Sequence, residues 1–558
     1  MTENIPWLAS YGEVPFHLEY STKSMCDTVL DTAAENADFP ALAFFGRKIK
    51  FSELATNIDR VARSFYSIGV RKGMRVMVCL PNVPQAIYCL YALNRIGAIA
   101  TMVHPLSAVG EIVYDLKEAH CNFAVTLDQF YPKFLEVMKE RALRKLVVAH
   151  VSDELPAFTA PFFRFFSESK FPKVDGAFAI SWKTFLKEGR HVRDGYVARK
   201  NPREEAVVLF SGGTTGVTKG IKLSDYNFNA LAAQTIAMSH ETINHSKMLA
   251  AMPVFHGFGL GVCIHTMMVA GGTAILVPRF NVKSYALLIK KHRPNFIAGV
   301  PSLFEAIARN TYLDGVDLSC LKGVFSGGDS LSIELKKKFD AFLAEHKAGI
   351  RIREGYGTTE CVTASCLTPY NKEKEGSIGL PYPDTYFKIC GVGTNDELPY
   401  GQEGEICLCG PTVMLGYIGH EKENAETLRV HADGRVWLHT GDLGIMDDEG
   451  FIYFRQRIKR MIITNGYNVY PSQIENVLDA HEAVRMSCVI GVPDPRKMHK
   501  VKAFVVLNEG WKDSPQLRES IMKHCSRSVA KYAMPYMIEV CDDLPKTLVG
   551  KVAYTKLS

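Results

Sequence analysis

A stretch rich in glycine and threonine stands directly after an apolar run at residues 206–210. It reads Ser211, Gly212, Gly213, Thr214, Thr215, Gly216, Val217, Thr218, Lys219 and Gly220. Free backbone N–H groups, several hydroxyls and one lysine can all donate to a single anion. The stretch predicts a phosphate-binding loop, with a flexible surface turn as the alternative for any Gly-rich pattern. A P-loop is excluded, because no Gly-Lys-Ser/Thr occurs in the stretch.

This loop resembles the phosphate loop of the adenylate-forming (ANL) superfamily, which includes acyl-CoA synthetases, aryl-acid ligases, luciferases and nonribosomal peptide adenylation domains. The form with Gly-Gly, and without proline before the lysine, is most similar to bacterial long-chain fatty acid–CoA ligases. Four more motifs follow in the family's order, so the resemblance covers almost the whole chain. It implies that the residues from Ser211 to Gly216, together with Lys219, bind ATP.

The second motif is Glu354-Gly355-Tyr356-Gly357-Thr358-Thr359-Glu360. It places a ring, two hydroxyls and a carboxylate after a short predicted strand, a set that can stack on a base, bond a phosphate oxygen and hold Mg²⁺. By the resemblance, Tyr356 contacts adenine, Thr359 the α-phosphate and Glu360 the magnesium ion. Gly357 and Thr358 belong to the same nucleotide site.

Two turns after predicted strands supply the next motifs. The turn at 326–329 contains Gly327, Gly328 and Asp329, and the resemblance assigns it to adenine and to the acyl side of the pocket. A tight turn with an N-cap aspartate is the alternative. Asp442 follows a predicted strand and can accept both ribose hydroxyls. A turn aspartate is its alternative, and the resemblance favours ribose binding.

The basic run 454–460 would ordinarily be a solvated face, but it resembles the family's joint between a large domain and a small mobile one. In that reading Arg457 contacts the ribose and Lys459 is the hinge residue. Gln456 departs from the commoner glycine or aspartate before the arginine.

The resemblance also covers the chain beyond the joint. The turn with Gly466 and Tyr467 resembles the loop that lines the pantetheine tunnel. Two lysines in a loop near a C-terminus are ordinarily surface residues. By the family's terminal motif, however, Lys551 reaches the active site.

These residues imply a two-step reaction. A carboxylate that attacks the α-phosphorus of ATP approaches another anion, so the site must first cancel charge. Mg²⁺ on Glu360, the phosphate loop and Lys551 would do this, giving an acyl-adenylate and pyrophosphate without a protein nucleophile. The thiolate of coenzyme A would then displace AMP after the lid moves about Lys459.

The acyl site is predicted among small and apolar residues, namely Phe258, Val300, Gly327, Gly328, Tyr356 and Val362. These types suit an alkyl chain, and no acidic residue stands ready for an amino group, which disfavours amino-acid adenylation. His256 stands where the family has an aromatic or histidine gate, although a lone histidine in an apolar run is more often a core residue.

The elements around these motifs alternate as β-α-β units, for example from residue 75 to 103. We therefore predict an α/β fold with a large N-terminal domain of doubly wound sheets (residues 1–456) that includes a β-rich subdomain near 376–417. A small mobile α+β lid domain follows (residues 457–558). The uncharged segment 248–277 contains Pro253 and five glycines, so it predicts strand, loop, helix and strand rather than a membrane span.

Composition is consistent with a multidomain protein of 558 residues and net charge +6. The 14 cysteines include no CxxC pair, which predicts reduced thiols in a cytosol rather than disulfides or a zinc site. The first six residues lack the features of a signal peptide, so we expect a cytoplasmic protein. Peripheral membrane contact stays open, because the substrate is hydrophobic.

The favoured function is ATP-dependent conversion of a medium- or long-chain fatty acid to its CoA ester. One alternative is an adenylating ligase for an aryl or bile acid, or for a carrier-protein thiol. A silent nucleotide-binding protein is more remote, since it would typically have lost Glu360 or Lys551. The expected partners are the acid, ATP and CoA, without nucleic acid, for a monomer or homodimer.

Overall fold

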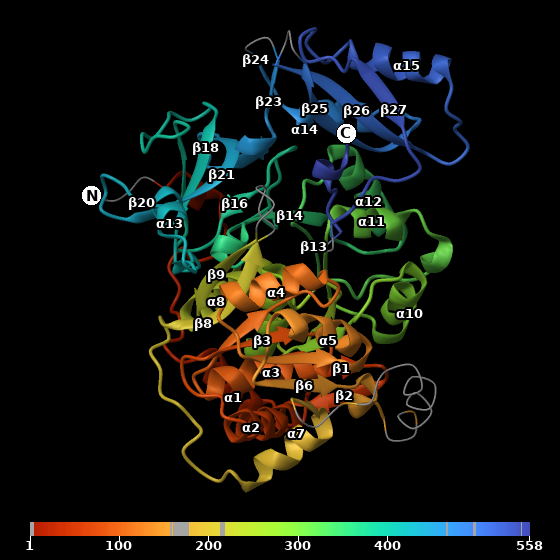
Figure 1. Cartoon of the computed structure of the whole chain (residues 1–558). Coiled ribbons are helices and arrows are strands. Elements are labelled where there is room, and N and C mark those ends of the chain that lie inside the picture. Colours follow the sequence, from red (N-terminus) through yellow and green to blue (C-terminus); the bar gives the residue numbers. More distant parts are fainter. Residues whose placement is uncertain are drawn as a thin grey trace.

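The computed structural model describes residues 5–156, 159, 174, 178–211, 218–464, 467–494, 498–547 and 550–558. Figure 1 shows a large body with a smaller C-terminal one, drawn in blue, above it. The large body contains two large mixed β-sheets and a smaller β-sheet, and the C-terminal body has a sheet of its own. The predicted α/β fold with a large N-terminal and a small C-terminal domain is confirmed.

The first large sheet has eight strands. In spatial order they are β19 (Gly416–Tyr417), β9 (Lys219–Ser224), β8 (Glu205–Ser211), β4 (Ile99–Met102), β3 (Arg75–Cys79), β5 (Phe123–Leu127), β6 (Lys145–Ala149) and β7 (Ala179–Ser181). The strands from β8 to β7 in this order run parallel, while β9 and β19 pair antiparallel at one edge. Parallel strands are covered on both faces, which explains their nearly continuous apolar runs.

The second large sheet has nine strands. In spatial order they are β16 (Leu380–Pro381), β15 (Cys366–Leu367), β14 (Ile352–Tyr356), β13 (Gly323–Ser326), β12 (Phe296–Gly299), β10 (Lys247–Ala250), β11 (Thr273–Leu276), β1 (Pro40–Phe44) and β2 (Arg47–Lys50). The uncharged segment forms β10, the π-helical η6 (Phe258–His265), α9 (Thr266–Val269) and β11, as expected.

Helices surround the two sheets (Figure 1). They are α1 (Met25–Glu35), α2 (Phe51–Ser67), α3 (Pro84–Arg95), α4 (Val109–Glu118), α5 (Tyr131–Glu140), α7 (Trp182–Glu188), α8 (Asp225–Ser239), α10 (Val282–His292), α11 (Pro301–Ala308) and α12 (Ile333–Glu345). Helix α3 begins at Pro84, as proline at the first helical position favours. Its residues 84–94 are all buried, because α1 and α2 pack against it.

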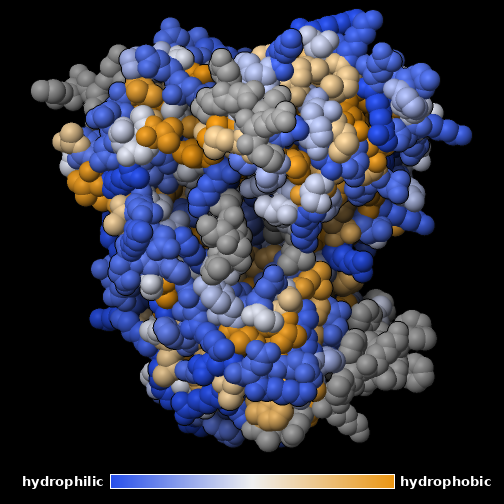
Figure 2. All heavy atoms as spheres, turned by 45° about the horizontal axis from the view of Figure 1, so that its top comes forward, coloured by the Kyte–Doolittle hydropathy of each residue, from blue (hydrophilic) through white to orange (hydrophobic). Residues whose placement is uncertain are grey.

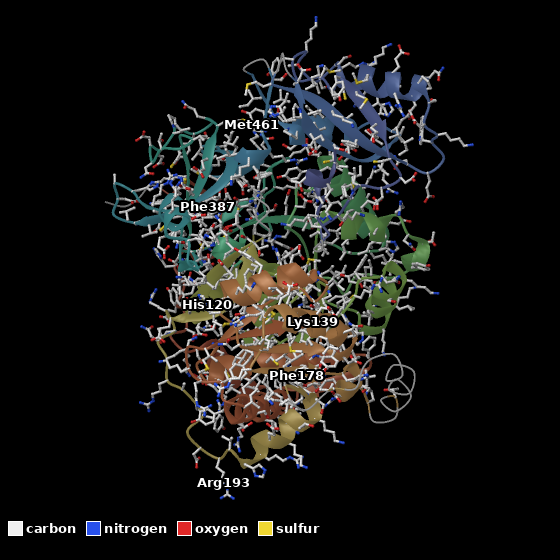
Figure 3. All side chains as sticks on the ribbon, in the orientation of Figure 1. His120, Lys139, Phe178, Arg193, Phe387 and Met461 are labelled. Carbon is white, nitrogen blue, oxygen red and sulfur yellow. The ribbon has the colours of Figure 1, made fainter. Side chains whose placement is uncertain are left out.

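A β-rich subdomain is present, as predicted, but its strands run to Arg457, well beyond the expected range 376–417. Its strands are β17 (Tyr386–Cys390), β18 (Gly404–Cys409), β21 (Val436–Met446), β20 (Leu428–Val430) and β22 (Ile452–Arg457), with helix α13 (Glu421–Thr427) beside them. The short η9 (Ile458–Arg460) then leads out of this sheet, and Figure 3 marks Met461 just beyond it. The boundary at residues 456 and 457 stays a prediction.

The small body is a sheet of β24 (Tyr467–Val469), β23 (Ile462–Thr464), β26 (Met498–Leu507), β25 (Val484–Asp494) and β27 (Met537–Val540), with α14 (Pro471–Asp479) and α15 (Pro515–Cys525). Helix α15 ends at Cys525. Ser526 donates its hydroxyl to the Lys523 carbonyl, a local bond that competes with a continuing helix.

The face shown in Figure 2 is mostly hydrophilic, with separate apolar patches. Among the described residues, no helix is long and apolar enough to cross a membrane.

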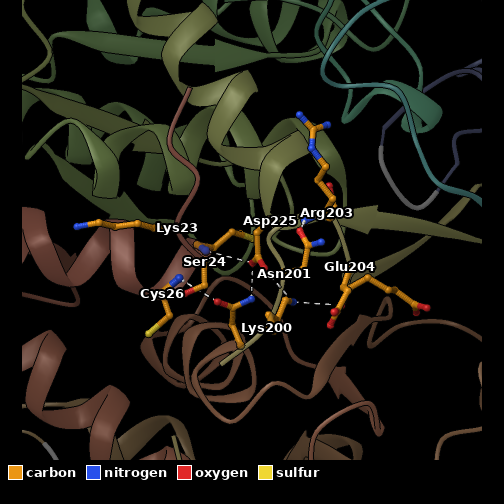
Figure 4. Close-up of polar contacts among 12 residues, drawn as sticks. Lys23, Ser24, Cys26, Lys200, Asn201, Arg203, Glu204 and Asp225 are labelled. Carbon is orange, nitrogen blue, oxygen red and sulfur yellow. Dashed lines mark hydrogen bonds and ion pairs between the residues drawn. The ribbon is translucent and has the colours of Figure 1, made fainter. Parts of the chain in front are cut away.

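A buried ion pair joins the N-terminal helices to α8 (Figure 4). Lys200 Nζ lies 2.9 Å from Asp225 Oδ2, and the two side chains are 2% and 0% exposed. Asp225 Oδ1 also accepts from the Met25 backbone N–H and from Asn94 Nδ2. One carboxylate therefore serves three donors, from α1, α3 and the segment before β8.

Candidate active site

The ends of the predicted phosphate loop form an antiparallel hairpin. Ser211 ends β8 and lies opposite Lys219, the first residue of β9. A strand follows the loop, whereas a P-loop would open a helix. The predicted ligands Gly212, Gly213, Thr214, Thr215 and Gly216 lie outside the described residues. At the loop's far end, the Thr218 hydroxyl donates to Asp115 Oδ1 at 3.1 Å.

Glu360 is joined to the hairpin through a tyrosine that sequence reasoning missed. Tyr417 Oη donates to Glu360 Oε1 at 2.9 Å, and Lys219 Nζ lies 5.1 Å from the centre of the Tyr417 ring. Thr359 precedes Glu360 in the short η8 (Thr359–Cys361). Carboxylate oxygens are ligands that Mg²⁺ prefers, and Glu360 is only half-buried. Glu360 therefore fits the predicted metal role. Thr358 is buried and its backbone N–H donates to Cys361 Sγ, which is a structural contact.

A second group joins Tyr356, Asp442 and Arg457. Tyr356 Oη donates to Asp442 Oδ2 at 2.7 Å, and Arg457 Nε lies 3.3 Å from Asp442 Oδ1. Burial raises the pKa of Asp442, while Arg457 and the Tyr356 hydroxyl oppose that shift. Asp442 was predicted to stand at a strand end, and this is wrong. It lies within β21, directly opposite Arg457 of β22. Gly441, with φ of 71°, bends the strand before it.

The terminal loop of the small body reaches the large one. Ser302 Oγ donates to the Gly550 carbonyl at 3.2 Å. The Lys551 side chain lies against Gly328, where an added Cβ atom would be 3.6 Å from Lys551 Cε. Burial and the charge of Arg457 lower the pKa of Lys551, whereas Asp329 acts in the opposite direction.

His256 lies in the turn that leads into η6, two residues before Phe258. Its Nδ1 accepts the Phe258 N–H at 3.2 Å. Burial, and then the nearby charge of Lys551, lower the pKa of His256 to about 3. The imidazole is therefore neutral near pH 7, with its proton on Nε2.

A cavity of about 970 Å³ opens between the two bodies. Eight predicted residues line it, namely Val300, Gly328, Asp329, Tyr356, Gly357, Asp442, Arg457 and Lys551. The predicted hinge residue Lys459 is exposed within η9, Gly466 lies outside the described residues, and for Tyr467 the structure describes only the backbone.

Three cavity residues were missed in the sequence. Glu354 accepts the Leu331 N–H at 3.1 Å and ties the turn after β13 to β14, and burial raises its pKa to about 7. Arg460 pairs with Glu475. Glu354 and Arg460 stood inside recognised motifs and could have been noticed, whereas Ser302 carries no sequence signal.

A separate apolar cavity of about 30 Å³ lies at the acyl side. Phe258, Gly327 and Gly328 line it, as predicted, together with Thr363 and Ala364. Val362 does not line it, because this buried residue packs behind Gly261. The cavity is far smaller than the engineered void of about 150 Å³ that holds benzene. An acyl chain therefore requires side chains to move.

The model of the AMP-binding enzyme family matches residues 29–418, and that of the AMP-binding enzyme C-terminal domain matches residues 473–551. The chain belongs to the AMP-binding enzyme family. The predicted assignment to adenylate-forming ligases is confirmed by this match and by curated relatives.

Two of those relatives span nearly the whole chain. A long-chain-fatty-acid–CoA ligase of Bacillus subtilis is 33% identical, covering 100% of this chain and 98% of its own length. A ligase of the same name from Escherichia coli O6:H1 is 31% identical, covering 99% and 97%. The crystal structure of the ATP-bound RpMatB-BxBclM chimera B1 has a TM-score of 0.83 at 24% identity, covering 96% of this chain and 98% of its own, and it supports the fold.

In this AMP-binding enzyme, Asp442→Asn is expected to raise the KM for ATP about tenfold. The change removes a charged acceptor, and such a hydrogen bond contributes about 1.5–3 kcal/mol. Steady-state kinetics with ATP varied, together with calorimetric titration of AMP, measure the effect. Asp448→Asn, at an exposed aspartate six residues further on, is the matched control. Equal KM values for the two variants would contradict ribose binding by Asp442.

Proposed function

We propose that this AMP-binding enzyme activates a medium- or long-chain fatty acid with ATP and transfers the acyl group from acyl-AMP to coenzyme A. The observation that carries the proposal is the position of Lys551. This residue of the small body lines the same cavity as Tyr356, Asp442 and Arg457 of the predicted nucleotide site. A cation at that position can neutralise the carboxylate and phosphate that must meet.

The chain's residues divide the work of the first step. Asp442 and Tyr356 hold the nucleoside, Lys219 and the loop before it hold the outer phosphates, and Lys551 orients the carboxylate toward the α-phosphorus. Mg²⁺ held by Glu360 would supply further charge neutralisation at the phosphates. The neutral His256 adds no charge of its own, which suits a gate between the acyl site and the thiol.

The choice of substrate rests on the relatives, both of which carry the name of a long-chain-fatty-acid–CoA ligase. The apolar cavity of about 30 Å³ admits neither an alkyl chain nor an aromatic ring without side-chain movement, so an aryl acid or another compact acid is the second candidate. Transfer to coenzyme A, Mg²⁺ dependence and contact with a membrane are parts of the same proposal.

Pyrophosphate release with ATP and Mg²⁺ should peak on medium or long chains in a series of straight-chain acids, and sustained AMP formation should require CoA. Benzoate and a bile acid are the matched probes for the alternative. Turnover on those acids alone would overturn the fatty-acid assignment but keep the adenylating activity. Release with none of these acids would favour a silent nucleotide-binding protein.

A further inference from the structure

Three potential metal ligands meet inside the β-rich subdomain, apart from the active-site cavity. They are Glu405 and Cys407 on β18 and His439 on β21. One carboxylate oxygen, the Sγ atom and one ring nitrogen all lie within 4.8 Å of one another, and all three residues are buried. The residues that line the large cavity do not include them.

Strand register explains the meeting. Cys407 lies directly opposite His439 between β18 and β21, and Glu405 stands two residues before Cys407 on the same face of β18. Cys390, on β17, lies opposite Glu405 and therefore on that face as well. Figure 3 marks this strand by Phe387. Ligands from neighbouring strands leave no CxxC-like spacing, so the cysteine pattern could not reveal them.

The distances suit one tetrahedral ion. Cys407 Sγ lies 3.4 Å from His439 Nδ1, which in turn lies 2.9 Å from Glu405 Oε2. Zinc bonds of about 2.3 Å to sulfur and about 2.0–2.2 Å to nitrogen and oxygen separate tetrahedral ligand atoms by roughly 3.3–3.8 Å. Shifts of a few tenths of an ångström would therefore admit the ion between Glu405, Cys407 and His439.

Cys390 is fully buried and stands opposite Glu405, beside this group but outside it, so its side chain must turn toward the ion to become the fourth ligand. Its thiol donates to the Asn395 carbonyl at 3.9 Å. Two thiolates and one carboxylate around a divalent ion leave one negative charge. Lys388 of β17, which is 8% exposed with Nζ 4.0 Å from the centre of the Trp437 ring, is a nearby positive charge that balances it.

Outer contacts already hold two of the ligands. The Gly441 N–H donates to Glu405 Oε1 at 2.9 Å. His439 Nε2 lies 2.9 Å from His431 Nε2, so a metal on Nδ1 leaves the Nε2 proton of His439 bonded to His431. Metal ligands in proteins are commonly oriented by such second contacts.

We propose that Cys390, Glu405, Cys407 and His439 bind one Zn²⁺ ion as a structural site. Thiolates with an imidazole select zinc over Mg²⁺ or Ca²⁺, and binding releases the two thiol protons to water. The ion ties β17 and β18 to β21, three residues before Asp442. The site therefore braces the strand that carries the predicted ribose ligand.

Metal analysis of the purified full-length chain tests this directly. After incubation with Zn²⁺ and gel filtration, we expect one zinc per chain by mass spectrometry. Co²⁺ in its place should give thiolate-to-cobalt absorption with the intensity of a tetrahedral site. Zinc should raise the thermal midpoint of the native chain and leave that of Cys407→Ser unchanged. Cys320→Ser, at a half-buried thiol of the large body, should retain the zinc.

Three outcomes overturn the proposal. They are a native chain that keeps no zinc and shows no cobalt–thiolate absorption, a Cys407→Ser variant that holds as much zinc as the native chain, and a Cys390–Cys407 disulfide in the isolated protein. If Cys407→Ser does not fold, the cobalt spectrum of the native chain and the zinc content of His439→Gln decide.

Discussion

Replacing Lys551 by alanine is expected to slow acyl-adenylate formation by about 10²–10³-fold, the usual cost of removing one group that stabilises developing charge. Lys551 lines the cavity with Asp329, Asp442 and Arg457, and its side chain lies against the turn at Gly328. Pyrophosphate release in a single turnover without CoA measures this step alone. Lys556→Ala, at an exposed lysine of the same terminal segment, is the matched control and should retain the native rate.

The pH dependence adds an independent check. Burial lowers the pKa of Lys551, and the protonated form is the one that neutralises the reacting anions. The rate should therefore be full below that pKa and fall as the pH rises through it, at a lower pH than an ordinary lysine would show. Lys551→Arg, whose charge persists at high pH, should lose the alkaline decline. An unchanged alkaline limb in that variant would assign the titration to another group.

Replacing Asp225 by alanine is expected to cost about 3–5 kcal/mol of folding stability, because it leaves the buried charge of Lys200 without its partner. The same change removes the acceptor of the Met25 N–H and of Asn94 Nδ2 (Figure 4). Urea unfolding followed by circular dichroism should show a transition at a much lower urea concentration than that of the native protein. Asp225→Asn keeps an acceptor oxygen and should lose less.

Asp31→Ala is the matched control for this prediction. Asp31 also pairs with a lysine, Lys23, but their side chains are 54% and 57% exposed. Exposed pairs add little to stability, so its unfolding curve should overlay that of the native protein. Equal curves for the two alanine variants would mean that the buried pair does not hold the N-terminal helices in place.

The motifs could be recognised from the sequence because each is contiguous. Ser211 and Lys219 flank one loop between two buried strands, and Tyr356 ends β14 only four residues before Glu360. Such segments place their side chains through local backbone geometry, which does not depend on distant residues. The β-α-β alternation was visible for the same reason, since strand and helix periods are local properties.

Contacts between distant segments were decided by the tertiary structure. Tyr356 reaches Asp442 across 86 positions, and Lys551 meets the turn at Gly328 only because the small body rests on the large one. Asp442 was expected at a strand end, but pairing of β21 with β22 carries the strand past it to Met446.

The β-rich subdomain shows most clearly which features the sequence determines and which depend on tertiary structure. The sequence by itself determined that short strands with cysteines, histidines and a glutamate occur there. Only the register between β17, β18 and β21 decided which of those side chains share a face. Register depends on turns, bends and packing along whole strands, and a shift by one residue would turn each ligand to the opposite face of the sheet.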